Sequence, residues 1–117
     1  MLNPHLNLNP KVFDKDVEKR ATRDGFGEAL TQLGEKNPNI IGLTADLSES
    51  TRMDSFAKKF PERFFELGVA EQNMAATAAG IAENGKIPFI SSYATFSPGK
   101  NLETIRTTIA YNQEWQA

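Results

Sequence analysis

The chain has 117 residues, of which 39% are hydrophobic, and its formal net charge is −2 from 13 basic and 15 acidic side chains. This length predicts one small domain, and the absence of a basic block disfavours nucleic-acid binding. The sequence contains no cysteine and a single histidine, His5, in a segment rich in proline and asparagine. Disulfides, thiolate zinc sites and a histidine-based catalytic triad in the folded part are therefore excluded.

The sequence also lacks membrane and export signals. No apolar run reaches the length of a membrane span, and the N-terminus lacks the basic-then-apolar pattern of a signal peptide. We therefore expect a cytoplasmic protein that contacts neither membranes nor nucleic acid. Pro4, Pro10 and several asparagines favour turns in residues 1–21, which we interpret as an N-terminal arm.

The first predicted helix spans about residues 24–36. Phe26, Leu30 and Leu33 recur at helical spacing and would share one face of this helix. Thr22 or Asp24 is the expected N-cap, because short polar side chains accept hydrogen bonds from the first free amide groups. The helix should end at residue 37, since the residue before a proline resists the helical conformation.

Strands and helices alternate in the remainder of the chain. The expected elements are a strand at 40–43, a short helix at 52–60, a strand at 63–67, an alanine-rich helix at 70–84, a strand at 87–90 and a helix at 101–111. Short continuous apolar strands between helices predict an α/β fold, an open parallel sheet with helices on both faces. Ligands bind such sheets outside the carboxyl ends of the strands.

Glu71 is the main candidate for a functional acid. It lies in the first turn of the alanine-rich helix, directly after the second strand, with Val69, Ala70 and Met74 around it. A carboxylate among apolar neighbours at a ligand-binding edge is a candidate for a perturbed, functional group. Its alternative role is to complement the helix dipole, as acidic residues in a first helical turn often do.

Further candidates follow the other two strands. Asp46 lies where the first strand meets a polar loop, and Tyr93 and Phe96 lie three residues apart after the third strand. The two aromatic side chains would either fill the core or form a stacking surface for a ligand. These residues and Glu71 map to one edge of the predicted sheet, which is the expected ligand edge.

Two weaker patterns do not support a further site. The Gly25-Phe26-Gly27 run lacks the third glycine and the preceding strand of a dinucleotide-binding fingerprint. Asp46, Glu49 and Asp54 lack the spacing of a calcium-binding loop. The sequence therefore predicts no metal ligands in this chain.

Three motifs together resemble the pyrimidine-binding domain of transketolases. They are TADL at 44–47, ELGVAEQNM at 66–74 and SYATF at 92–96. The chain is similar to the C-terminal subunit of split transketolases, over about residues 12–112. We accordingly divide it into an N-terminal arm (1–21), a partial pyrimidine-binding domain (22–112) and an unassigned tail (113–117), and we expect the domain to be incomplete.

The resemblance implies thiamine diphosphate as cofactor. Glu71 would hydrogen-bond a ring nitrogen of its aminopyrimidine, with a pKa raised by burial. Phe96 would stack on the pyrimidine, Tyr93 would line the same pocket, and Asp46 and Leu47 would lie beside the cofactor at a subunit interface. The implied reaction, in the pentose phosphate pathway, moves a two-carbon ketol unit from a ketose phosphate to an aldose phosphate.

The resemblance also implies a partner. Members of this family hold the diphosphate and Mg²⁺ with a Gly-Asp-Gly motif in another domain, and this motif is absent here. We therefore expect an N-terminal transketolase-like subunit to carry that domain in a hetero-oligomer, with the present chain inactive alone. Three alternatives stay open: a deoxyxylulose phosphate synthase-like subunit, a 2-oxo acid dehydrogenase E1 beta-like subunit, and a catalytically inactive truncated fragment.

Overall fold

The computed structural model describes residues 9–112. Its main elements, in chain order, are α1 (Thr22–Lys36), β1 (Ile40–Thr44), α2 (Asp54–Lys59), β2 (Phe64–Glu66), α3 (Glu71–Glu83), β3 (Ile87–Ser91) and α4 (Leu102–Thr104). A 3₁₀ turn, Pro61–Arg63, precedes β2, and a π-helical segment, Ile105–Ala110, continues α4. The predicted tail and the first eight residues of the predicted arm lie outside the described residues.

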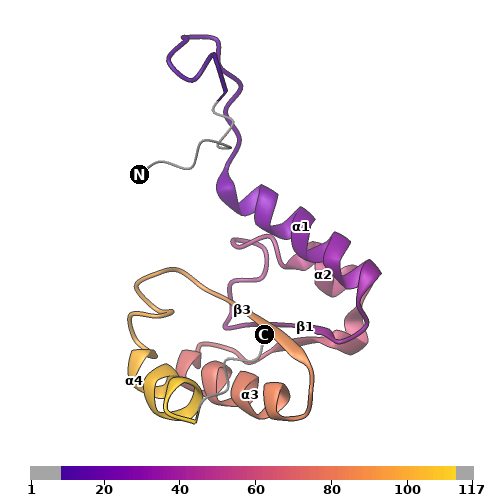
Figure 1. Ribbon diagram of the computed structural model, residues 1–117, viewed down its shortest axis with the longest axis vertical. Coiled ribbons are helices and arrows are strands. Elements are labelled where there is room, and N and C mark those ends of the chain that lie inside the picture. Colours follow the sequence, from indigo (N-terminus) through magenta and orange to yellow (C-terminus); the bar gives the residue numbers. More distant parts are fainter. Residues whose placement is uncertain (1–8, 113–117) are drawn as a thin grey trace.

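The three strands form one parallel sheet in the order β2-β1-β3. Figure 1 shows α1 and α2 on one face of this sheet and α3 and α4 on the other. The predicted open parallel sheet with helices on both faces is therefore confirmed for residues 9–112. Parallel strands require crossover connections, and here α2 and α3 each lie in a connection between successive strands.

Successive side chains of β1 point to opposite faces, so the central strand contributes to two separate cores. Ile41 and Leu43 belong to a cluster with residues of α3, whereas Ile40 belongs to a cluster with residues of α1 and α2. Every residue of β1 is buried. This burial explains why the strand appears in the sequence as a continuous apolar run rather than as an alternating pattern.

Two details at the helix ends differ from the sequence prediction. The N-cap of α1 is Ala21, without a side-chain hydrogen bond, and not Thr22 or Asp24. The predicted helix at 101–111 is also wrong as a continuous α-helix, because a π-helical segment follows one turn of α4. This segment is rich in β-branched residues, which crowd the helical turns, and the Thr107 hydroxyl donates to the carbonyl oxygen of Glu103.

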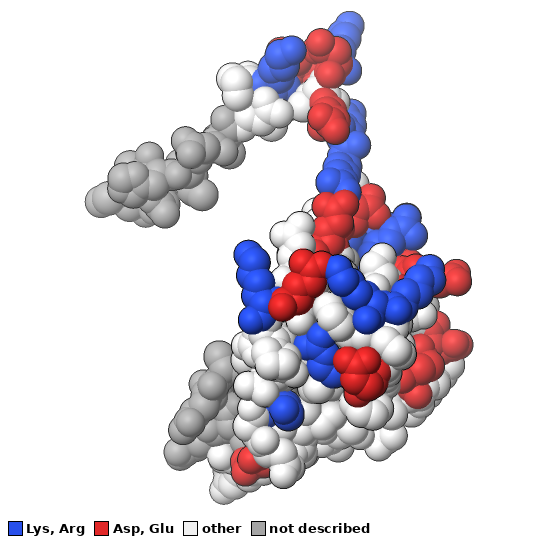
Figure 2. Space-filling view, turned by 90° about the vertical axis from the view of Figure 1, so that its right-hand side faces the viewer, with Lys and Arg blue, Asp and Glu red and all other residues white. Residues whose placement is uncertain are grey.

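Charged side chains are unevenly distributed over the face shown in Figure 2. Basic and acidic residues intermingle along the arm and the upper part of the body, whereas the lower part carries few charges. Within the part of the chain that the structure describes, no helix combines the length and the apolar character needed to cross a bilayer.

Candidate functional site

The three strands end in register, which brings three loops to the same edge of the sheet. Thr44, the last residue of β1, pairs with Glu66 of β2 and with Ser91 of β3. The loops that follow these residues all start from the carboxyl edge of the sheet. This is the edge at which open parallel sheets bind ligands.

Glu71 begins α3 at this edge and is almost fully buried, with 2% of its surface exposed. Its carboxylate accepts a hydrogen bond from the Lys100 ammonium, at 2.8 Å between Nζ and Oε2. The Asn101 side-chain amide donates to the main-chain carbonyl of Glu71 at 3.1 Å and to the Ser97 hydroxyl at 3.1 Å. Glu71 is therefore held by the same loop that carries Tyr93 and Phe96.

The Lys100 ammonium lowers the pKa of Glu71, contrary to the raised pKa expected from burial alone. Its hydrogen bond is the main cause, and a backbone hydrogen bond at Glu71 acts in the same direction. Burial opposes both effects but is outweighed. In this state the carboxylate is ionised and paired with a cation.

Tyr93 and Phe96 form a stacked aromatic pair on the loop after β3. Their ring centroids are 6.3 Å apart and their planes differ by 22°. Tyr93 is 46% exposed and Phe96 37%, so neither ring fills the core. Main-chain hydrogen bonds from the amides of Phe96 and Ser97 to the Tyr93 carbonyl, both 2.8 Å, tighten the turn between them. The geometry is that of an exposed aromatic pair.

Asp46 and Leu47 begin the loop after β1. Asp46 is exposed and has a positive φ of 61°, which is uncommon for a residue other than glycine. Its main-chain amide donates to Oε1 of Glu66 at 2.7 Å, and Leu47 is half-buried next to it. The structure thus places all five predicted site residues on loops or a helix start at one edge of the sheet.

A hollow of about 400 Å³ lies beside these loops and was not foreseen from the sequence. It is lined by Thr22, Arg23, Phe26, Ser50, Thr51, Ser91, Ser92, Tyr93 and Ala94. Among the described residues, the buried Ser92 hydroxyl has no hydrogen-bond partner. The hollow therefore has an arginine in its wall next to the predicted stacking surface.

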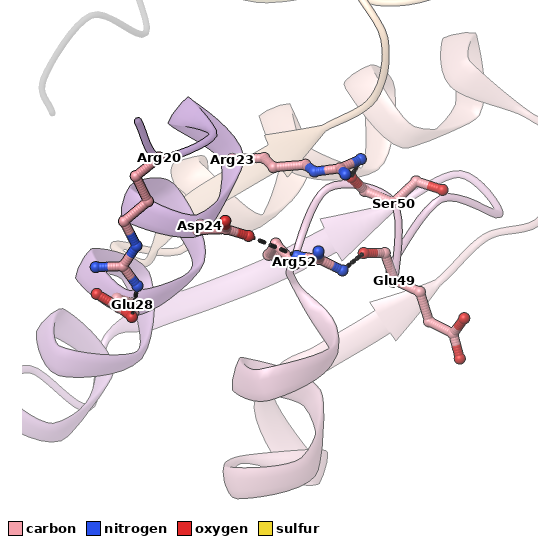
Figure 3. Close-up of polar contacts among 7 residues, drawn as sticks. All are labelled: Arg20, Arg23, Asp24, Glu28, Glu49, Ser50 and Arg52. Atoms are coloured by element: carbon pink, nitrogen blue, oxygen red, sulfur yellow. Dashed lines mark hydrogen bonds and ion pairs between the residues drawn. The ribbon is translucent and has the colours of Figure 1, made fainter. Parts of the chain in front are cut away.

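Figure 3 shows how α1 meets the loop after β1, and Arg23 of α1 and Ser50 of this loop contribute to the lining of this hollow. The Arg23 guanidinium donates to the Ser50 carbonyl at 3.4 Å, and Arg52 Nε donates to Asp24 at 2.7 Å. Arg52 lowers the pKa of Asp24 through this hydrogen bond. Arg23 and Ser50 are far apart in sequence, so only the packing of α1 against this loop could bring them together.

Within residues 9–112, no three histidine or acidic side chains gather closely enough to hold a metal ion.

The fold defines a parallel α/β domain whose carboxyl sheet edge combines a buried acid with an exposed aromatic pair. The family model of the transketolase pyrimidine-binding domain matches residues 18–117. The chain belongs to the transketolase family and contributes the pyrimidine-binding domain of that family, which confirms the resemblance seen in the three sequence motifs.

Three relatives illustrate the match. A candidate transketolase C-terminal section of Methanocaldococcus jannaschii is 53% identical over 92 residues, which cover 79% of this chain and 29% of the relative. The 1-deoxy-D-xylulose-5-phosphate synthase of Dictyoglomus thermophilum is 49% identical over 71 residues, or 61% of this chain and 12% of the relative. A solved structure described as a split gene transketolase, inactive beta4 tetramer, matches with a TM-score of 0.73 and 52% identity, covering 81% of this chain and 32% of that chain. The chain therefore spans less than a third of each of these proteins.

Proposed function

We propose that this chain is the pyrimidine-binding part of a thiamine-diphosphate-dependent transketolase whose diphosphate-binding domain lies on a partner chain. The observation that carries the proposal is the position of Glu71. Its carboxylate is buried at the carboxyl edge of the sheet and is held by the loop that presents two exposed aromatic rings. A ligand recognised there would combine a flat ring with a polar ring edge, which describes an aminopyrimidine.

The residues present fit this cofactor by the chemistry of their donor and acceptor groups. Glu71 supplies a buried acceptor for a ring N–H, and Phe96 and Tyr93 supply a surface for the flat face of the ring. The ring would take the place at the carboxylate that Lys100 Nζ occupies in this structure. The Lys100 side chain is 47% exposed, so it has room to move into solvent.

When bound, thiamine diphosphate supplies the electron sink that carbon–carbon bond cleavage and formation require. The contribution of this chain is to bind and orient the cofactor and to hold a proton between Glu71 and the ring edge. Departure of Lys100 would remove the main influence that lowers the pKa of Glu71, which leaves a backbone hydrogen bond that lowers this pKa and burial that raises it. Asp46 and Leu47, at the start of the neighbouring loop, would border the cofactor.

The hollow beside Tyr93 fits a phosphorylated sugar. Its volume lies within the range of small-molecule sites, and Arg23 at its wall matches a phosphate in charge. We therefore assign the ketose phosphate and aldose phosphate to this side of the site. Replacement of Arg23 should raise the KM for phosphorylated substrates more than it lowers kcat.

A partner chain completes the proposed enzyme. One relative is described as a C-terminal section, and a structural relative as an inactive beta4 tetramer of a split gene transketolase. Both descriptions support a division of the enzyme between two chains. We propose that the N-terminal partner holds Mg²⁺ and the diphosphate, and that the hetero-oligomer is the active form.

A deoxyxylulose phosphate synthase-like reaction is the second candidate. It is favoured by the 49% identity to such a synthase over 71 residues. The two reactions use different donor substrates, since a transketolase takes its two-carbon unit from a ketose phosphate and the synthase uses pyruvate. A product assay with each donor and a common aldose phosphate acceptor would separate them. Decarboxylation of pyruvate without a new ketose phosphate would instead favour the 2-oxo acid dehydrogenase-like alternative.

The decisive experiment compares Glu71→Gln with Glu83→Gln in the complex of this chain with its diphosphate-binding partner. Glu83 is an exposed glutamate at the other end of α3 and serves as the matched control. Loss of a proton-transferring group typically reduces the rate by about 10²–10⁴-fold, which we expect for Glu71→Gln in the steady-state assay. The control should leave turnover unchanged.

Strong turnover by Glu71→Gln in this assay would contradict the role assigned to Glu71. If the complex with the unmodified chain bound no thiamine diphosphate, the alternative of a catalytically inactive fragment would be favoured. Binding is best followed by titration calorimetry in the presence of Mg²⁺, because it does not require turnover.

A further inference from the structure

Glu66, the last residue of β2, joins two loops through one carboxylate oxygen. Its Oε1 accepts a hydrogen bond from the Asp46 main-chain amide at 2.7 Å and another from the Gly68 amide at 3.0 Å. Asp46 lies in the loop after β1, and Gly68 lies in the turn that leads from β2 into α3. The side chain thus reaches across from one strand to the loop that follows its neighbour.

The two amide donors belong to residues with unusual backbone conformations. Asp46 has a φ of 61° and Gly68 a φ of 66°. A positive φ carries no penalty for glycine but is unfavourable for aspartate, and it persists only where the surroundings hold it. The hydrogen bond from the Asp46 amide to the Glu66 carboxylate is charge-assisted and therefore strong, so it helps to hold Asp46 in this conformation.

The register of the sheet explains why this bridge forms at Glu66. Thr44 pairs with Glu66, so the loop that begins after Thr44 starts beside the end of β2. The Leu67 amide continues the ladder by donating to the Thr44 carbonyl at 3.0 Å. Asp46 lies just beyond this last ladder bond, and its amide donates to the Glu66 carboxylate instead of to a main-chain carbonyl.

Both ends of the bridge lead to residues of the proposed cofactor site. Asp46 and Leu47 lie at one end, and the turn at the other end runs through Gly68 and Ala70 to Glu71. The Ala70 amide donates to the Gly68 carbonyl at 2.7 Å, so a change in the conformation of Gly68 would also move the start of α3. A shift in this turn would therefore move the buried carboxylate of Glu71 relative to the loop after β1.

We propose that Glu66 is a positioning residue that sets the distance between the Asp46 loop and the helix start at Glu71, and thereby the affinity for the aminopyrimidine cofactor. This inference rests on the proposed function for its ligand, but the bridge itself is independent of it. Glu66 acts through main-chain amides and needs no contact with the cofactor.

The test compares Glu66→Met, Glu66→Gln and the control Glu83→Met in the complex with the diphosphate-binding partner. Methionine keeps the length of the side chain but accepts no strong hydrogen bond, whereas glutamine keeps a carbonyl oxygen at the same position. Two quantities are measured: the Kd for thiamine diphosphate with Mg²⁺, and hydrogen–deuterium exchange in peptides that cover residues 45–50 and 67–71.

For Glu66→Met we expect faster exchange in both segments, because both hydrogen bonds to Oε1 are lost, and a Kd raised about tenfold. Turnover at saturating cofactor should stay within about threefold, because Glu66 does not touch the reacting atoms. Glu66→Gln should recover most of the affinity, and Glu83→Met should match the unmodified chain. A merely structural role would not produce this recovery together with a change confined to Kd.

Unchanged exchange in the two segments of Glu66→Met would show that the bridge does not hold these loops and would overturn the proposal. Faster exchange with an unchanged Kd would overturn the positioning role while leaving the proposed function intact. Absence of thiamine diphosphate binding by the unmodified complex would instead defeat the proposed function and, with it, this role of Glu66. The exchange measurement distinguishes these cases because it does not depend on the cofactor.

Discussion

The two faces of the sheet are built from different kinds of side chain. On the face covered by α1 and α2, the core contains large aromatic residues together with aliphatic ones. Its rings come from Phe26, Phe56, Phe60, Phe64 and Phe89. On the face covered by α3, the helix contributes Met74 and alanines, and the buried acid Glu71 lies at its start.

Gly34 and Arg63 also shape the packing on the face covered by α1 and α2. A Cβ atom at Gly34 would lie 2.6 Å from Cε2 of Phe56, so only glycine lets α1 approach α2 this closely. The Arg63 guanidinium lies 3.9 Å from the centre of the Phe60 ring and donates to the carbonyls of Gly34 and Asn37, both at 3.1 Å. Arg63 thus bonds to carbonyl groups at the C-terminal end of α1 and also covers the aromatic cluster.

This difference shows how one small domain separates stability from function. Burial of large rings provides most of the hydrophobic free energy per residue, and it is concentrated on the α1–α2 face. The small residues of α3 bury less surface, but they let the helix lie close to the sheet. That close approach places the first turn of α3, and with it Glu71, beneath the loop that carries Lys100 and Asn101.

The largest loss of stability is expected for Phe56→Ala, on the face of the sheet covered by α1 and α2. Phe56 is fully buried, and removal of such a ring leaves a cavity that costs about 3–5 kcal/mol of unfolding free energy. Phe65→Ala is the matched control, because Phe65 is 43% exposed and should cost far less. Urea denaturation followed by circular dichroism measures both, and equal losses would contradict the assignment of stability to the α1–α2 face.

The face covered by α3, whose helix contributes alanines to the core, should instead be sensitive to larger side chains. Ala78→Leu inserts three carbon atoms into a tightly packed contact between α3 and the sheet, which should cost about 1–3 kcal/mol of unfolding free energy. Ala76 lies on the same helix but is exposed, so Ala76→Leu should stay within about 0.5 kcal/mol of the unmodified protein. If the two leucine variants had the same stability, α3 would not need small residues for its close approach.

Much of this architecture was predictable from local patterns. The order of the elements followed from short apolar runs that alternate with helical spacing, and the edge of the site followed from the rule that parallel sheets bind ligands at their carboxyl ends. The placement of Glu71 at a helix start next to a strand could be predicted for the same reason. The exposed pair of Tyr93 and Phe96 was one of two alternatives that the sequence left open.

Contacts between distant segments could not be predicted. The pairing of Lys100 with Glu71 links residues on a loop and a helix, and it reverses the expected direction of the pKa shift at Glu71. The hollow at Arg23 and Ser50 depends on how α1 packs against the loop after β1. The π-helical segment was missed because helical spacing alone does not report how β-branched side chains crowd a turn.

The smallest expected effect concerns the charge of Glu71, on the face of the sheet covered by α3. It is recognised by its dependence on pH. In the unmodified protein, the Lys100 ammonium holds the pKa of Glu71 below its ordinary value of 4.5. A lowered pKa in the folded state stabilises the fold above the unfolded-state pKa, and this stabilisation is lost as the pH falls through the folded-state pKa. Lys100→Met should therefore destabilise the protein at neutral pH, and the difference should shrink as the pH falls below about 4.5.

Lys86→Met is the control for this last comparison, because Lys86 Nζ donates to the neutral Asn39 side chain at 3.0 Å and not to a carboxylate. Its effect on stability should not vary with pH over the same range. Urea midpoints measured for the three proteins between about pH 3 and pH 7 give the difference directly, since the titration of all other carboxylates cancels. A Lys100→Met difference that stayed constant across this range would mean that Lys100 contributes packing rather than charge at Glu71. The face covered by α3 would then owe nothing to the ion pair at its buried acid.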